Sequence, residues 1–191
     1  MSTITWPAGV VPRNFSMRLA AVQRVFSAPF SGSEQAVDLL NDRWKVSMDL
    51  TPRDGYDWAA QIEAFIAALR GQTNDVSLWH FARPTVRGTL ASATASSAAQ
   101  GASAVTLSGT GTLKAGDMLG ISGLLLQVAA DVTLAGSGSV TLVNRLRTAV
   151  SGTVTLIRPT ASFRLASPGA GVQYSPGMSE AISLDFVEKV A

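Results

Sequence analysis

The single histidine and the carboxylates are the residues that could do acid–base chemistry. His80 lies between Trp79 and Phe81 in an apolar stretch, and no motif ties a serine or aspartate to it. Asp54 and Asp57 lie three residues apart beside an expected helix start, where carboxylates favour capping and the helix dipole. A glycosidase pair from distant parts of the chain stays open. We interpret His80 as structural, and we predict no catalytic residue and no enzyme activity.

Metal and cofactor sites have little support in the sequence. The chain has no cysteine, which excludes thiolate ligands, and one histidine does not build a poly-histidine site within one chain. Residues 109–114, Gly-Thr-Gly-Thr-Leu-Lys, lack the spacing of a phosphate-binding loop. Residues 114–117, Lys-Ala-Gly-Asp, instead favour a tight turn in which the aspartate bonds locally. We therefore predict no cofactor and no metal.

The charge pattern does not favour nucleic acid or membrane partners. The net charge is +2, and the lysines and arginines are scattered without a basic cluster or stripe. The longest uncharged run, residues 89–113, is rich in Ser, Thr and Gly and is not apolar enough to span a bilayer. The first seven residues show no signal-peptide pattern. We expect no specific nucleic-acid binding, no membrane insertion and synthesis without a signal peptide.

Hydrophobic periodicity predicts a mainly β fold with one helix. Period-two alternation indicates strands at residues 15–19, 44–50, 163–165 and 182–186, and an apolar run indicates another at 76–81. A further strand is expected near residues 35–40. Between residues 56 and 70 the apolar positions change to helical spacing, with Gly71 at the position of a C-terminal cap.

A change in composition divides the chain. Residues 85–158 hold 7 of the 28 charged residues and contain short apolar runs separated by Gly and Ser. This pattern is typical of a small all-β barrel or sandwich. We predict that this module is inserted into a sheet-plus-helix domain formed by residues 1–84 and 159–191. The Ala/Ser-rich residues 91–103 favour a flexible linker into the module.

Two apolar segments have no obvious place in a core. Trp6 and Pro7 lie in an N-terminal segment that its prolines keep extended, whereas Trp44 and Trp58 fall on apolar faces of expected elements. Residues 28–33 form a turn-rich loop with an exposed-looking aromatic, Phe30. An apolar segment with nothing of its own to pack on packs on a neighbour, so we expect an oligomer.

An ordered set of short motifs resembles the distal tail proteins of long-tailed bacteriophages, and it extends over nearly the whole chain. The set consists of Trp6-Pro7, residues 27–35, Asp42-Arg43-Trp44, Ala82-Arg83-Pro84, residues 113–117, Phe163-Arg164-Leu165 and residues 182–188.

The resemblance implies a structural virion protein at the tail tip. Members of this family form a hexameric ring that joins the tail tube to the tail-tip hub and adhesion device. Their belt domain, a β-sandwich with a helix, makes the ring, and a small galectin-like or OB-like β module projects from it. The partners would be other copies of the chain, the tail tube protein and hub proteins, and the protein would be made in the host cytoplasm.

The residues that we expect at these interfaces are not catalytic. We predict ring or tube contacts at Trp6, Pro7, Pro29, Phe30, Ser31 and Gly32. Arg43 either fixes a loop through a charge-assisted hydrogen bond or is a simple surface arginine.

Two alternatives to a distal ring stay open. One is a carbohydrate- or receptor-binding module of the tail tip, which the absence of Trp, Tyr and Phe from residues 85–158 counts against. The other is a tail-completion or head–tail joining ring.

Overall fold

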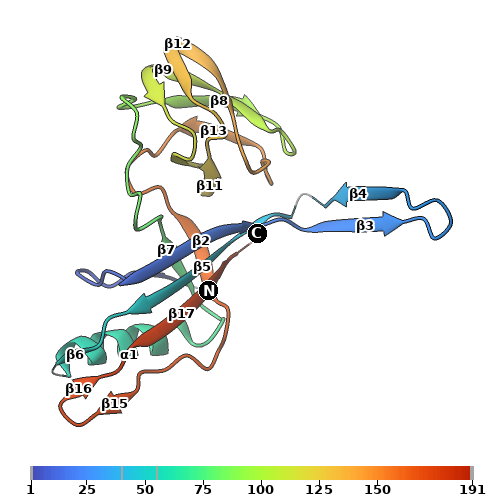
Figure 1. Cartoon of the computed structure of the whole chain (residues 1–191). Coiled ribbons are helices and arrows are strands. Elements are labelled where there is room, and N and C mark those ends of the chain that lie inside the picture. The colour runs from blue at the N-terminus through green and yellow to red at the C-terminus, as the bar shows by residue number, and fades with distance from the viewer. Residues whose placement is uncertain (1, 40, 55, 190–191) are drawn as a thin grey trace.

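The protein is mainly β with a single helix among its described residues, as the periodicity predicts. The computed structural model describes residues 2–39, 41–54 and 56–189. Within them, the largest unit is a six-stranded sheet in the order β1-β7-β14-β17-β5-β2 (Figure 1). Its strands are β1 (Thr3–Thr5), β2 (Asn14–Ala20), β5 (Arg43–Leu50), β7 (Asp75–Leu78), β14 (Ala161–Leu165) and β17 (Ile182–Glu188).

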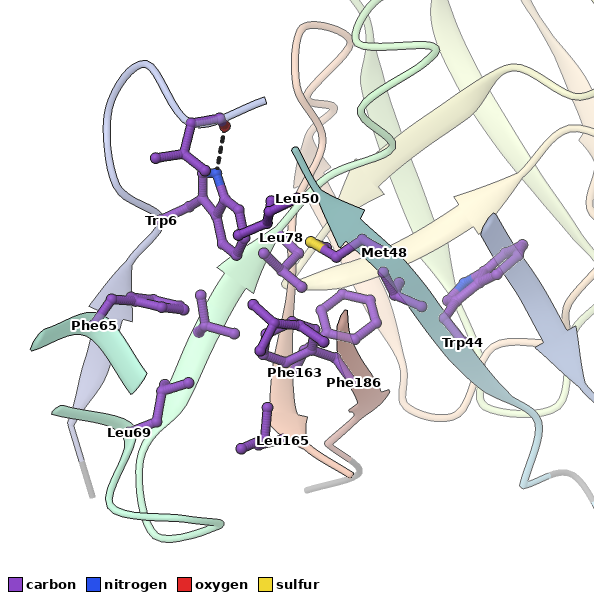
Figure 2. Packing of buried hydrophobic residues seen from close by; sticks show 14 of the residues in the cluster. Trp6, Trp44, Met48, Leu50, Phe65, Leu69, Leu78, Phe163, Leu165 and Phe186 are labelled. Carbon is purple, nitrogen blue, oxygen red and sulfur yellow. Dashed lines mark hydrogen bonds between the residues drawn. The ribbon is translucent and has the colours of Figure 1, made fainter. Parts of the chain in front are cut away.

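The main core forms on one face of this sheet. The inward residues of β5, Trp44, Val46, Met48 and Leu50, are all buried, and those of β17 pair beside them. Figure 2 shows Trp44, Met48 and Leu50 in one buried cluster with Phe163 and Phe186 from the C-terminal strands. Burial of alternate residues on one face is the main stabilising contribution, at about 25 cal/mol per Å² of apolar area.

Helix α1 (Asp57–Leu69) covers that face. Its buried residues Ala59, Ile62, Phe65 and Leu69 follow the helical spacing of the sequence. The prediction of an aspartate cap is wrong, because the residue before the helix, Tyr56, makes no side-chain capping bond. Asp57 instead lies in the first turn, where its charge favours the helix dipole. The chain leaves the helix through two left-handed residues, Arg70 and Gly71.

Two small sheets flank the main one. The strands β6 (Arg53–Asp54), β15 (Tyr174–Ser175) and β16 (Met178–Ser179) form a three-stranded sheet in the order β15-β16-β6. In Figure 1 this sheet lies beside α1, at one end of the domain. The strands β3 (Gln23–Ser27) and β4 (Glu34–Asp38) form a hairpin at the opposite end.

The inserted module has a hydrophobic core of its own. Its four-stranded sheet has the order β12-β9-β8-β13, and β10 pairs with β11. The bounds are β8 (Thr94–Ala98), β9 (Ala104–Leu113), β10 (Met118–Ile121), β11 (Leu124–Gln127), β12 (Val132–Thr141) and β13 (Val150–Thr153). The buried cluster of this module contains only residues between 90 and 156.

Two expectations for the module need correction. None of the described sheets closes into a barrel: β10 and β11 form a separate two-stranded sheet, and Gly120–Thr155 beside it is an isolated bridge. The Ala/Ser-rich segment is also not simply a linker, since β8 lies within it and pairs with both β9 and β13. Ala93 and Ala95 are buried there, so small side chains serve close packing.

Hydrogen bonds from buried and half-buried groups join the module to the domain that contains the large sheet. The guanidinium of Arg147 donates to both carboxylate oxygens of Glu188 and to the carbonyl of Asp42, which lies 2.9 Å away. The indole Nε1 of Trp44 donates to the carbonyl of Leu125 at 2.9 Å. Arg83 donates through Nη1 to the carbonyl of Gly116 at 2.6 Å. These bonds hold the module in one orientation on the sheet.

Candidate functional site

The most unusual feature of the surface is the hairpin formed by β3 and β4, residues 23–38, which we call the projecting hairpin. It extends away from the body of the molecule in Figure 1. Its five cross-strand pairs run from Gln23–Asp38 to Ser27–Glu34. At its base, the Leu39 amide donates to the Val22 carbonyl at 3.0 Å, and the Val22 amide donates to Asp42 Oδ1 at 3.3 Å.

The tip of the hairpin is the turn-rich loop seen in the sequence. The Ala28 amide donates to the Ser33 carbonyl at 2.9 Å, and the Gly32 amide donates to the Ala28 carbonyl at 3.2 Å. Gly32 has a φ of 64°, a left-handed conformation that glycine adopts without steric cost. The turn thereby directs Phe30 outward, and its side chain is fully exposed. Pro29, Ser31 and Gly32 are exposed around it.

Neither face of the hairpin is covered by the described part of the chain. All five residues of β3 are exposed, including Val25 and Phe26, of which Phe26 is 58% exposed. Val37 on β4 is exposed too. An isolated two-stranded hairpin is marginally stable in water, and contiguous exposed apolar side chains typically mark an interaction site. This combination identifies the hairpin as the candidate partner-binding element.

The structure corrects the reason for expecting Trp6 at an interface. Trp6 is only 5% exposed and packs edge-on against Phe65 and Phe81, with ring centroids 5.2 and 5.4 Å away. Its Nε1 donates to the Val10 carbonyl at 2.8 Å (Figure 2). The N-terminal segment therefore packs on its own domain, and Pro7 lies half-buried beside it.

Arg43 lies at the base of β5 and is half-buried. Its Nε donates to Oδ1 of Asn41 at 3.4 Å, a long bond to a neutral amide two residues away. This contact lies in the short segment that follows the projecting hairpin. The bond supports that connection locally, and its length makes it weaker than the short bonds that a guanidinium donates to a carboxylate.

His80 has a structural environment. Its ring packs edge-on against Phe15, with ring centroids 5.0 Å apart, and the Arg83 amide donates to Nδ1 at 3.0 Å. Burial, and then the charge of Arg83, lower the pKa of His80 to about 4. The imidazole is therefore neutral at pH 7. Its hydrogen-bond partner, Arg83, lies in the segment that connects the two domains and is not a nucleophile.

The turn at residues 114–117 is confirmed. Asp117 is buried and accepts the Lys114 amide at 2.8 Å and the Arg87 Nε at 2.9 Å. Gly116 has a φ of 87°, which the turn requires. Among the described residues, no group of three His, Asp or Glu side chains could hold a metal ion. In the same part of the chain, no helix has the length and apolar character to cross a membrane.

A hollow of about 720 Å³ lies on the outer face of the large sheet, away from α1. Its charged lining residues are Arg18, Lys45, Arg164 and Asp185. Arg18 and Lys45 are register partners on adjacent strands. With a single carboxylate and no histidine, this lining does not hold the paired groups that acid–base hydrolysis needs.

The sequence prediction places Pro29, Phe30, Ser31 and Gly32 correctly in an exposed turn but misses strand β3. The signal for β3 is weak, because Val25 and Phe26 are adjacent rather than alternating. Comparison with known proteins adds no assignment: neither a family model nor a curated protein matches the sequence.

Proposed function

We propose that this chain is a structural virion protein that assembles into a ring at the distal end of a bacteriophage tail tube. The ring would join the tube to the tail-tip hub and adhesion device, and its partners would be further copies of the chain, the tube protein and hub proteins. The family and the location rest on the resemblance of the motifs. The resemblance also implies the self-association, and the exposed surface of the projecting hairpin supports it.

The observation that carries the proposal is the projecting hairpin. A chain that extends two short strands into solvent, with Phe26 and Phe30 exposed, gains little stability from them as a monomer. A partner that covers these side chains would stabilise both the hairpin and the assembly. The fixed junction between Arg147 and Glu188 supports a scaffolding role, because it holds the inserted module at a constant angle to the domain that carries the hairpin.

The test is the mass of the purified protein in solution, measured by light scattering over a range of concentrations, with negative-stain images of the same samples. We expect rings with about six times the 19.9 kDa chain mass. A chain that stays monomeric at the highest concentrations would contradict the proposed self-assembly.

A further inference from the structure

A second exposed apolar surface lies at the other end of the domain from the projecting hairpin. It consists of Tyr56, Tyr174 and Met178, and we call it the tyrosine patch. The rings of Tyr56 and Tyr174 meet edge-on, with centroids 5.9 Å apart. All three side chains are exposed, although they lie on a well-bonded framework. The Gly177 amide donates to the Tyr56 hydroxyl at 2.9 Å, and the Tyr174 hydroxyl donates to Glu63 Oε2 at 2.7 Å.

Carboxylates surround the tyrosine patch. Asp54, Asp57, Glu63 and Glu180 are all exposed on β6, on α1 and on the segment after β16. Arg53 is the basic residue of the same small sheet, and its guanidinium lies 5.3 Å from the ring centre of Trp58. The surface is therefore apolar at its centre and acidic at its rim.

The projecting hairpin has a face of the opposite charge. Cross-strand partners share a face, so Arg24 and Val37 lie beside Phe26 and Gln35 on one side of the hairpin. That side presents one aromatic ring, one valine and one cation without a carboxylate. It matches the tyrosine patch in apolar character and complements it in charge.

We infer that the tyrosine patch of one copy binds the projecting hairpin of the next copy, through the face that contains Arg24, Phe26 and Val37. This inference rests on the proposed self-assembly and names its two surfaces. Because the hairpin and the patch lie at opposite ends of the domain in Figure 1, the contact is head-to-tail. Repeating a head-to-tail contact generates a closed ring when its rotation closes.

A mixing experiment tests this contact. The hairpin variant combines Arg24→Gln with Phe26→Ser and keeps the patch, whereas the patch variant combines Glu63→Lys with Met178→Lys and keeps the hairpin. Each variant alone should self-associate about tenfold more weakly or worse, as expected for loss of a central contact. Mixed in equal amounts, they should form a species of two chains, because one intact hairpin meets one intact patch and the assembly then stops.

Two controls separate this contact from general surface effects. Val143→Ser removes an exposed valine from the inserted module, and Ser137→Lys adds a charge to the exposed side of β12. Both should assemble like the original chain. Thermal unfolding of every variant checks the fold. Should Met178→Lys lower the melting temperature, Glu63→Lys alone replaces the double change, because Glu63 is exposed on α1 and its replacement removes only the hydrogen bond from the Tyr174 hydroxyl.

The outcomes are distinct. A patch variant that assembles as well as the original chain would overturn the inference, while the original chain's own assembly would leave the proposed function standing. A pair of variants that stay separate on mixing, although the original chain forms rings, would also overturn it. An original chain that stays monomeric would contradict both the contact and the proposed self-assembly.

Discussion

Two antiparallel ribbons of this protein have similar hydrogen bonding but different surroundings. The β9–β12 ribbon has ten paired positions, and its inward residues, such as Leu107 and Val140, are buried in the core of the inserted module. The projecting hairpin has five paired positions and exposes Val25 and Phe26. Other strands of the module pack on the inward side of the β9–β12 ribbon. None of the described residues packs over the projecting hairpin in the same way. An exposed ribbon of this kind is a typical binding site for a partner, because its apolar side chains and backbone groups are not covered by its own chain.

The largest effect on folding should come from a core residue of the β9–β12 ribbon. Leu107 is fully buried, so Leu107→Ala leaves a cavity and should lower the free energy of unfolding by about 2–5 kcal/mol. Chemical denaturation at one fixed protein concentration measures this change. Thr106→Ala, on the exposed side of the same strand, is the control and should stay within about 0.5 kcal/mol.

Glycines in the β9–β12 ribbon and at the tip of the projecting hairpin have different surroundings. A Cβ at Gly111 would lie 2.7 Å from the Leu90 Cα, so Gly111→Ala must displace backbone and should lower the free energy of unfolding by at least about 2 kcal/mol. A Cβ at Gly32 would meet no atom within 4 Å. Gly32→Ala should therefore show only the cost of a left-handed alanine, about 1 kcal/mol. An equal decrease in the free energy of unfolding of the two variants would contradict this difference in surroundings.

Acidic pH should lower the free energy of unfolding, and His80 is the group responsible. Its pKa is lowered to about 4 in the folded protein by burial and by Arg83, against about 6.5 for an unperturbed histidine. As the pH falls from about 6.5 to about 4, the unfolded chain binds the proton first, so the free energy of unfolding should fall across this range. Unfolding titrations of the original chain and of His80→Gln measure it. A variant with an undiminished pH dependence between these values would exclude His80 as the source.

The smallest effect on folding should come from the projecting hairpin. Phe26→Ser alters an exposed side chain, so the free energy of unfolding of the monomer should change by less than about 0.5 kcal/mol. Self-association should nevertheless weaken by about tenfold, because the side chain would be buried between copies. Sedimentation velocity measures the association, and denaturation of dilute samples measures the stability. If stability falls while association is unchanged, Phe26 serves its own chain rather than a partner.

Much of the fold is predictable because its elements bury one face each. The alternation at Trp44, Val46, Met48 and Leu50 and the helical spacing from Trp58 to Leu69 are direct consequences of that burial. Strand β8 has mainly small residues, Thr94 to Ala98, and such a pattern also suits a linker. Closure of a barrel depends on hydrogen bonds between distant strands, on which local patterns carry no information.

The candidate site was predictable in part. The turn around Phe30 is marked by Pro29 and Gly32, which act locally on the backbone. The burial of Trp6 depends on Phe65, Phe81 and Phe186, which are all distant in the chain. The prolines near Trp6 predict an extended backbone but not the side chains that cover the indole ring. The Arg147–Glu188 pair joins residues 41 positions apart and has no sequence motif.

Hydrogen exchange of the projecting hairpin, followed by mass spectrometry at high and low protein concentration, is the most direct test that another copy covers it. We predict that peptides spanning residues 23–38 are protected at high concentration and exchange rapidly on dilution, while peptides of the β9–β12 ribbon exchange slowly at both. Rapid exchange of residues 23–38 in samples that scattering shows to be fully assembled would show that no other copy covers the projecting hairpin.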